Sequence, residues 1–308
     1  MLRFLAGRIA LGALTVFVTT ILVTLLIHVV PGDPVQIMYA QSQGSTPEQI
    51  EQVRRNLGLD QPIYIQYIQY IGRLSEGDLG HTIRGGQPVL DVILQRLPNT
   101  VVLAVAAMAM AIAIGLPLGF FAAYYRGSLI DTGLMALAIA GISMPHFWLG
   151  LILLFFFAVE LGWLPVSGSG PANLILPAVT LGLSNAAIFA RLTRSSMIDV
   201  MNQDFVHTAL AKGLPRTLVF RRHVLRAGLV PLVTMMGLQF AFMMGGAIVV
   251  ENIFSWNGVG RMAVEAIFQR DYPIIQGFIL TFAIVVVFVS ICLDALYAFI
   301  DPRIRRAA

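Results

Sequence analysis

Charged residues are scarce in this chain of 308 residues: they make up 12% of the sequence, while 57% is hydrophobic and the mean hydropathy is +0.81. A typical soluble domain is about 25% charged and about 45–50% apolar. So little charge excludes a disordered protein, a nucleic-acid-binding domain and an ordinary cytosolic enzyme. It favours several helices in contact with lipid.

Cysteine and lysine each occur once. Cys292 allows no internal disulfide and no cysteine metal site. Lys212 does not lie in a phosphate loop of the form G-x-x-x-x-G-K-[ST], and no other lysine can supply one. The motifs G-x-S-x-G and H-E-x-x-H are absent, and none of the five histidines has metal-ligand spacing. We predict no catalytic residue, no bound cofactor or metal, and no enzyme activity in this chain, which argues against an intramembrane protease.

Long apolar runs are what the sequence does contain. A helix that crosses a bilayer needs about 20 apolar residues, and six runs approach or exceed that length, at 9–30, 100–124, 133–161, 174–190, 229–250 and 274–300. Pro145 predicts a kink in the third run. The first could be a cleaved signal peptide, but its length and the PGDP sequence at 31–34 favour a retained helix. The predicted fold is all-α, a polytopic membrane protein with six transmembrane helices.

The arginines predict the orientation. With a cytoplasmic N-terminus, 13 of the 20 basic residues fall on the inner side, and most acids fall on the outer side. The positive-inside rule then places both termini and the 191–228 loop in the cytoplasm. The predicted organisation is a first transmembrane helix at 1–30, an extracytoplasmic helical insertion at 31–97, and a five-helix core at 98–308 that includes the cytoplasmic loop.

The insertion carries two predicted helices. Thr46 and Pro47 form a helix start, with Gly58 as the stop, which predicts a helix over 47–57. Residues 62–74 place Tyr64, Tyr67 and other apolar side chains on one helical face. This face suits either the membrane interface or packing on the ends of the spans, and the sequence leaves both open.

The 191–228 loop is far longer than a connection between two membrane helices requires. Its spacing predicts a short helix over 205–212, ended by Gly213 and Pro215. Ala209, Ala211 and Gly213 carry little bulk beside Lys212, so this helix could contact another protein closely.

The loop and motifs along the whole chain resemble the permease subunits of binding-protein-dependent ABC importers, specifically the group for dipeptides, oligopeptides, nickel complexes and glutathione. The other matching motifs include RLPNT at 96–100 and GGAIVVENIF at 245–254. His207 and Thr208 stand where the broader importer signature begins with Glu and Ala. The resemblance assigns contact with an ATPase to Asp204, Phe205, Thr208, Ala209, Ala211, Lys212, Gly213 and Leu214.

The resemblance implies a passive subunit that forms half of a translocation pathway. ATP and Mg²⁺ would bind on one or two separate ATP-binding subunits, a second similar permease would complete a heterodimer in the lipid, and an external solute-binding protein would dock on 32–97 and 251–273. The expected cargo is a di-, oligo- or glutathione-like peptide, with nickel or another metal chelate as the alternative. Gly245, Gly246 and Glu251 are the candidates for a path or gate, although the two glycines also suit plain helix packing.

Two other transporter classes fit less well. An ion-coupled carrier needs several ionisable groups in the membrane and an internal repeat, whereas Asp294 is the one clear acid in a predicted span. We expect Asp294 to pair with an arginine near the C-terminus. A simple channel does not explain the long cytoplasmic loop.

Overall fold

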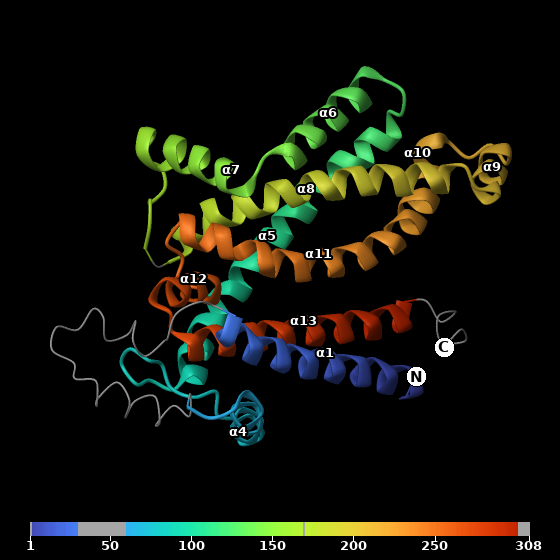
Figure 1. Ribbon diagram of the computed structural model, residues 1–308. Coiled ribbons are helices and arrows are strands. Elements are labelled where there is room, and N and C mark those ends of the chain that lie inside the picture. Colours follow the sequence, from blue (N-terminus) through green and yellow to red (C-terminus); the bar gives the residue numbers. More distant parts are fainter. Residues whose placement is uncertain (1, 30–59, 169, 301–308) are drawn as a thin grey trace. The chain divides into compact units, whose positions relative to one another are not determined.

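The computed structural model describes residues 2–29, 60–168 and 170–300 (Figure 1). Within these ranges the regular elements are helices, and the β-structure is limited to one isolated bridge between His81 and Pro88. The predicted all-α fold is confirmed. The predicted helix over 47–57 and the PGDP sequence lie outside the described residues, as does the side chain of Asp294. The chain forms two compact units, residues 1–97 with 262–291, and residues 98–261 with 292–308.

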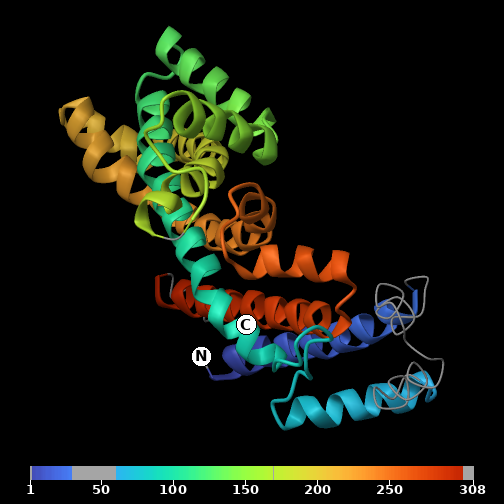
Figure 2. The ribbon, with the colours of Figure 1, turned by 90° about the vertical axis from the view of Figure 1, so that its left-hand side faces the viewer.

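The first unit contains α1 (Leu2–Val29), α4 (Ile63–Ser75), the start of α5 (Val89–Tyr124), most of α12 (Val259–Gln269) and most of α13 (Tyr272–Ile300). α1 and α13 lie side by side in both views (Figures 1 and 2). Gly12 permits this approach, because a methyl group there would lie 2.5 Å from a Val287 side-chain carbon. α4 begins after Pro62, as the sequence predicts, and packs on α1.

A hydrogen-bonded turn joins α4 to α5 in the first unit. The Thr82 amide donates to the Gln87 carbonyl at 2.8 Å, and the Asp271 carboxylate accepts from the Ile83 amide at 2.9 Å. Burial raises the pKa of Asp271 above its usual value, although backbone hydrogen bonds to its carboxylate act in the opposite direction. Asp271 therefore holds this turn against the α12–α13 junction.

The second unit is built around α8 (Pro171–Met201), which lies along α11 (Leu225–Ile253) and also packs on α6 (Leu129–Ser143) and α7 (His146–Leu153) (Figure 1). Small residues bring α5 close to α8, since a methyl group at Gly115 would lie 2.5 Å from the Ala186 carbonyl oxygen. Gly119, one turn later, meets the Ala190 carbonyl in the same way. This Gly-x-x-x-Gly contact was not predicted from the sequence, although its spacing is typical of close membrane-helix packing.

The third predicted span is broken. α6 ends at Ser143, and α7 continues through the π-helical η1 (Leu154–Glu160) after a bend of 98°. Pro145 stands at the break and begins α7, so the kink expected there is confirmed. Among the described residues four helices could cross a membrane alone, or up to six if each of two bent pairs counts as one span. The predicted count of six is therefore reached only with both bent pairs.

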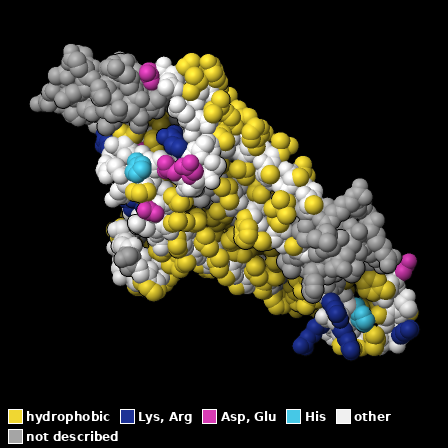
Figure 3. All heavy atoms as spheres, turned by 90° about the horizontal axis from the view of Figure 1, so that it is seen from below, with side chains coloured by type: hydrophobic (Ala, Val, Ile, Leu, Met, Phe, Trp, Pro, Cys, Tyr) yellow, Lys and Arg dark blue, Asp and Glu magenta, His cyan; other side chains and the backbone are white. Residues whose placement is uncertain are grey.

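Hydrophobic side chains cover most of the described surface on the face drawn in Figure 3. Large apolar residues from several long helices are more than half exposed, among them Leu14, Leu137, Phe242 and Phe288. Such a surface would aggregate in water but is suited to lipid.

Candidate functional site

The connection between α8 and α11 folds as a small helical module. We define the connection module as α9 (Asp204–Ala211), α10 (Arg216–Val219) and the π-helical η2 (Phe220–Val224). The predicted short helix over 205–212 is confirmed as α9, shifted by one residue. Gly213 ends it with a backbone φ of +82°, which glycine adopts without strain, and its amide donates to the Leu210 carbonyl at 2.9 Å.

α9 has an inner and an outer side. Val206 and Ala209 are buried in a cluster with the end of α8 and the start of α11. Ala209 is therefore small because of packing within this chain, and Leu214 packs against the same cluster. The outer side is exposed and consists of Asp204, Phe205, His207, Thr208, Leu210 and Ala211, followed by Lys212 and Gly213. Six of the eight residues assigned from the resemblance thus face away from the chain's own core.

Aromatic packing ties the connection module to the end of α5. The Phe220 ring meets Phe120 edge to face at a centroid distance of 4.9 Å and Tyr124 at 5.2 Å. The Arg216 guanidinium lies over the Tyr124 ring, 5.7 Å from its centroid, and donates to the Tyr124 carbonyl. The module is consequently fixed to α5 through its second half, while α9 remains exposed.

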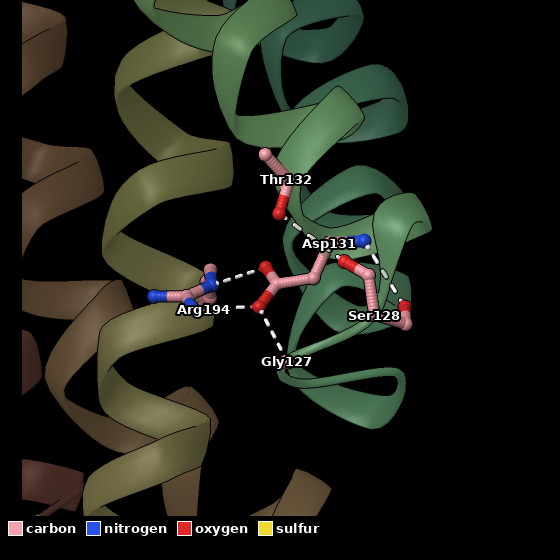
Figure 4. Close-up of polar contacts among 5 residues, drawn as sticks. All are labelled: Gly127, Ser128, Asp131, Thr132 and Arg194. Atoms are coloured by element: carbon pink, nitrogen blue, oxygen red, sulfur yellow. Dashed lines mark hydrogen bonds and ion pairs between the residues drawn. The ribbon is translucent and has the colours of Figure 1, made fainter.

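An ion pair ties α8 to α6 (Figure 4). Nε of Arg194 donates to one Asp131 carboxylate oxygen at 2.6 Å, and a terminal nitrogen donates to the other at 2.7 Å. The Gly127 amide donates to the same carboxylate at 3.0 Å, and the Ser128 hydroxyl accepts from the Asp131 amide at the start of α6. The bidentate geometry sets the orientation of α6 on α8 as well as their distance.

A third tie joins α8 to α11, where the Ser196 hydroxyl donates to the Gly228 carbonyl at 2.7 Å. The fully buried Met197 side chain lies against Gly228, where there is no space for a methyl group. Sequence reasoning missed Asp131, Arg194 and Ser196 as members of the site. An acid just before the third apolar run and an arginine just after the fourth were the available signal for the ion pair.

Replacing Asp131 by Asn should lower the free energy of unfolding by about 2 kcal/mol. This is less than the roughly 3–5 kcal/mol lost when a fully buried pair is broken, because the Arg194 side chain is 30% exposed. Unfolding by a denaturing detergent in mixed micelles measures this change in the free energy of unfolding. Arg191→Gln, an exposed arginine one turn earlier on α8, is the control and should change little. Equal losses for both variants would contradict a specific pair.

A second polar site forms at the corner between α11 and α12, which we define as residues 251–261. The Glu251 side chain is fully buried, and its carboxylate accepts from the Thr100 hydroxyl at 2.6 Å and from the Arg261 amide at 2.9 Å. The Thr100 oxygen also accepts from the Val259 amide at 2.9 Å. Glu251 therefore fastens the start of α12 to α5.

Further hydrogen bonds connect the α11–α12 corner to α5. The Trp256 indole donates to the Asn99 carbonyl at 3.0 Å, and the Asn99 side chain donates to the Asn257 carbonyl at 2.7 Å. A methyl group at Gly258 would collide with the Glu251 carboxylate. The corner thus brings together the RLPNT and GGAIVVENIF motifs, which are separate in the sequence. Gly245 lies half-buried on α11, and the surroundings of Gly246 fall outside what the structure describes.

Comparison with known proteins gives the family. Residues 115–306 match the binding-protein-dependent transport system inner membrane component, and residues 1–104 match the N-terminal binding-protein-dependent transport system membrane component. The chain belongs to the binding-protein-dependent transport permeases. The glutathione transport system permease protein GsiC of Escherichia coli (strain K12) is 43% identical to this permease over 307 residues, 99% of each chain. GsiC of Shigella dysenteriae serotype 1 (strain Sd197) has the same identity and coverage.

Solved structures support the fold of the permease. The MetNI methionine ABC transporter, in an inward-facing conformation, matches with a TM-score of 0.60 and 16% identity over 69% of this chain and 97% of that chain. An amino acid ABC transporter crystallised with histidines gives a TM-score of 0.53 and 15% identity over 68% and 94% of the two chains. The permease is a multi-pass inner-membrane subunit of an ABC importer, as the sequence motifs implied.

Proposed function

We propose that this permease forms half of an ATP-driven import pathway for glutathione or a closely similar peptide. The supporting observation is the identity of 43% with GsiC glutathione permeases, which extends over 99% of both chains. The chain itself supplies the path and the mechanical contact, while ATP and Mg²⁺ bind to separate subunits.

The exposed side of α9 is the contact with the ATP-binding subunit in this proposal, and it lies on the cytoplasmic side. Asp204, Thr208 and Ala211 are exposed there, whereas Val206 and Ala209 anchor α9 in its own chain. A push on α9 passes to α5 through Phe220, to α6 through Arg194 and to α11 through Ser196. Because Arg194 and Ser196 belong to α8, these ties make four helices, α5, α6, α8 and α11, respond to one contact on α9.

The family also implies two further partners. A second permease completes the pathway, and a solute-binding protein docks outside on the turn before α5 and on the α11–α12 corner. Both surfaces are held by buried carboxylates, Asp271 and Glu251, so they present fixed shapes to a partner. We retain Gly245, Gly246 and Glu251 as candidates for the path or gate. Glu251 would act indirectly, by holding the α11–α12 corner in place.

Uptake by the complete transporter tests the substrate. The permease, its partner permease, the ATP-binding subunits and the solute-binding protein are reconstituted in liposomes with ATP inside the compartment that the ATPases face. We expect saturable uptake of labelled glutathione that requires ATP. An excess of unlabelled glutathione should compete, whereas an unrelated dipeptide or a nickel chelate should compete weakly. Preferential uptake of the dipeptide or the nickel chelate would reject the glutathione assignment while leaving the importer assignment intact.

A further inference from the structure

Helix α4 exposes an apolar face that the described chain does not cover. Tyr64 and Ile68 are each 66% exposed. Tyr70 is buried on the packed side of the helix, and Tyr67 is half-buried between the two sides with its hydroxyl near Thr20. Packing on α1 therefore uses only one part of the apolar surface of α4.

The exposed surface of α4 divides into an apolar and a polar sector. Successive residues of an α-helix are rotated by about 100°, so residues four apart lie about 40° from each other. Tyr64 and Ile68 form the apolar sector in this way. Gln69 and Arg73, also four apart and exposed, form a polar sector about 140° further around the helix. Such an arrangement suits a helix that lies along a boundary between an apolar and a polar phase.

The contact with α1 places α4 beside the second half of that helix. The Tyr67 and Thr20 hydroxyls lie 3.1 Å apart, within hydrogen-bond distance. Thr20 lies in the second half of α1, nine residues before the end of that helix at Val29. Leu22 and Leu25 of that last part of α1 are exposed, 60% and 43% respectively. α4 thus lies beside a segment of α1 that itself faces lipid.

We propose that α4 is an interfacial helix whose Tyr64–Ile68 sector contacts lipid acyl chains, while Gln69 and Arg73 face the headgroups and water. An amphipathic helix of this kind lies in the plane of the interface with its apolar side buried below the headgroups. Tyrosine suits this position because its ring is buried while its hydroxyl remains hydrated. The proposal thus assigns the two alternatives left open by the sequence, the membrane interface and packing on a span, to different sectors of one helix.

Spin-label accessibility in liposomes tests this placement. Single cysteines are introduced at Tyr64, Ile68, Gln69 and Arg73 into a full-length Cys292→Ser chain within the assembled transporter, since Cys292 is exposed. Oxygen, which dissolves in lipid, and a water-soluble nickel chelate are compared as collision partners. The ratio of oxygen to chelate accessibility should exceed one at positions 64 and 68 and fall below one at 69 and 73. Leu22→Cys on α1 provides the lipid reference.

Two results would overturn the proposal. A ratio below one at positions 64 and 68 would place that sector in water. Low accessibility to both collision partners there would show that a protein surface covers it. All four positions are exposed, so their labelling should leave the fold intact, and an unchanged elution volume of each labelled transporter verifies this.

Discussion

Ala211→Arg should reduce ATP-dependent uptake at least about 10-fold, which corresponds to about 1.4 kcal/mol or more of lost interaction with the ATP-binding subunit. Ala211 is exposed on the outer side of α9, and arginine costs only a few tenths of a kcal/mol in an exposed helix. The variant should therefore fold and insert normally. The long charged side chain would stand where the partner's surface needs to approach the α9 backbone. Uptake and the amount of ATP-binding subunit that co-purifies both measure this loss.

The matched control for Ala211→Arg is Ser195→Arg, which adds the same side chain to an exposed position on α8. We expect this variant to transport at close to the normal rate. Normal uptake by the Ala211 variant would show that α9 does not dock through this side. An equal loss in both variants would indicate a general effect of an added charge.

Glu251→Ala should lower the free energy of unfolding by about 3 kcal/mol. The substitution leaves the Thr100 hydroxyl and the Arg261 amide without their acceptor in a buried site, and each unsatisfied group costs about 1–3 kcal/mol. Glu251→Gln keeps one acceptor oxygen and the shape of the side chain, so its loss should be about 1 kcal/mol. Denaturing-detergent unfolding measures both values.

The control for Glu251→Ala is Glu265→Ala. Glu265 is a half-exposed partner of Arg96 at 3.6 Å, and such exposed pairs contribute about 0–1 kcal/mol. A stable Glu251→Ala variant with altered transport would contradict the fastening role and assign the carboxylate to the path itself. Loss of stability in proportion to the lost hydrogen bonds would support fastening of α12 to α5.

Several elements follow from local sequence because their causes are local. The apolar runs predict the long helices, Pro145 predicts the break between α6 and α7, and Gly213 predicts the end of α9. The family was also evident from motifs along the chain. Ala209 shows the limit of such reasoning, since its small size was assigned to a partner contact and instead serves packing within the chain.

The sequence by itself determined that this is an all-helical membrane protein, because composition, hydrophobic run length and charge placement act on each segment separately, and its motifs indicated an importer permease. Only the tertiary structure decided which polar residues meet. Asp131 and Arg194 are 63 residues apart, and Thr100 and Glu251 are 151 apart. Hydrogen bonds in a low-dielectric interior require contact to within about 3 Å, and no periodicity along the chain specifies contacts between distant helices. Likewise, the side of α9 that can contact a partner depends on which side packs against the core of its own chain.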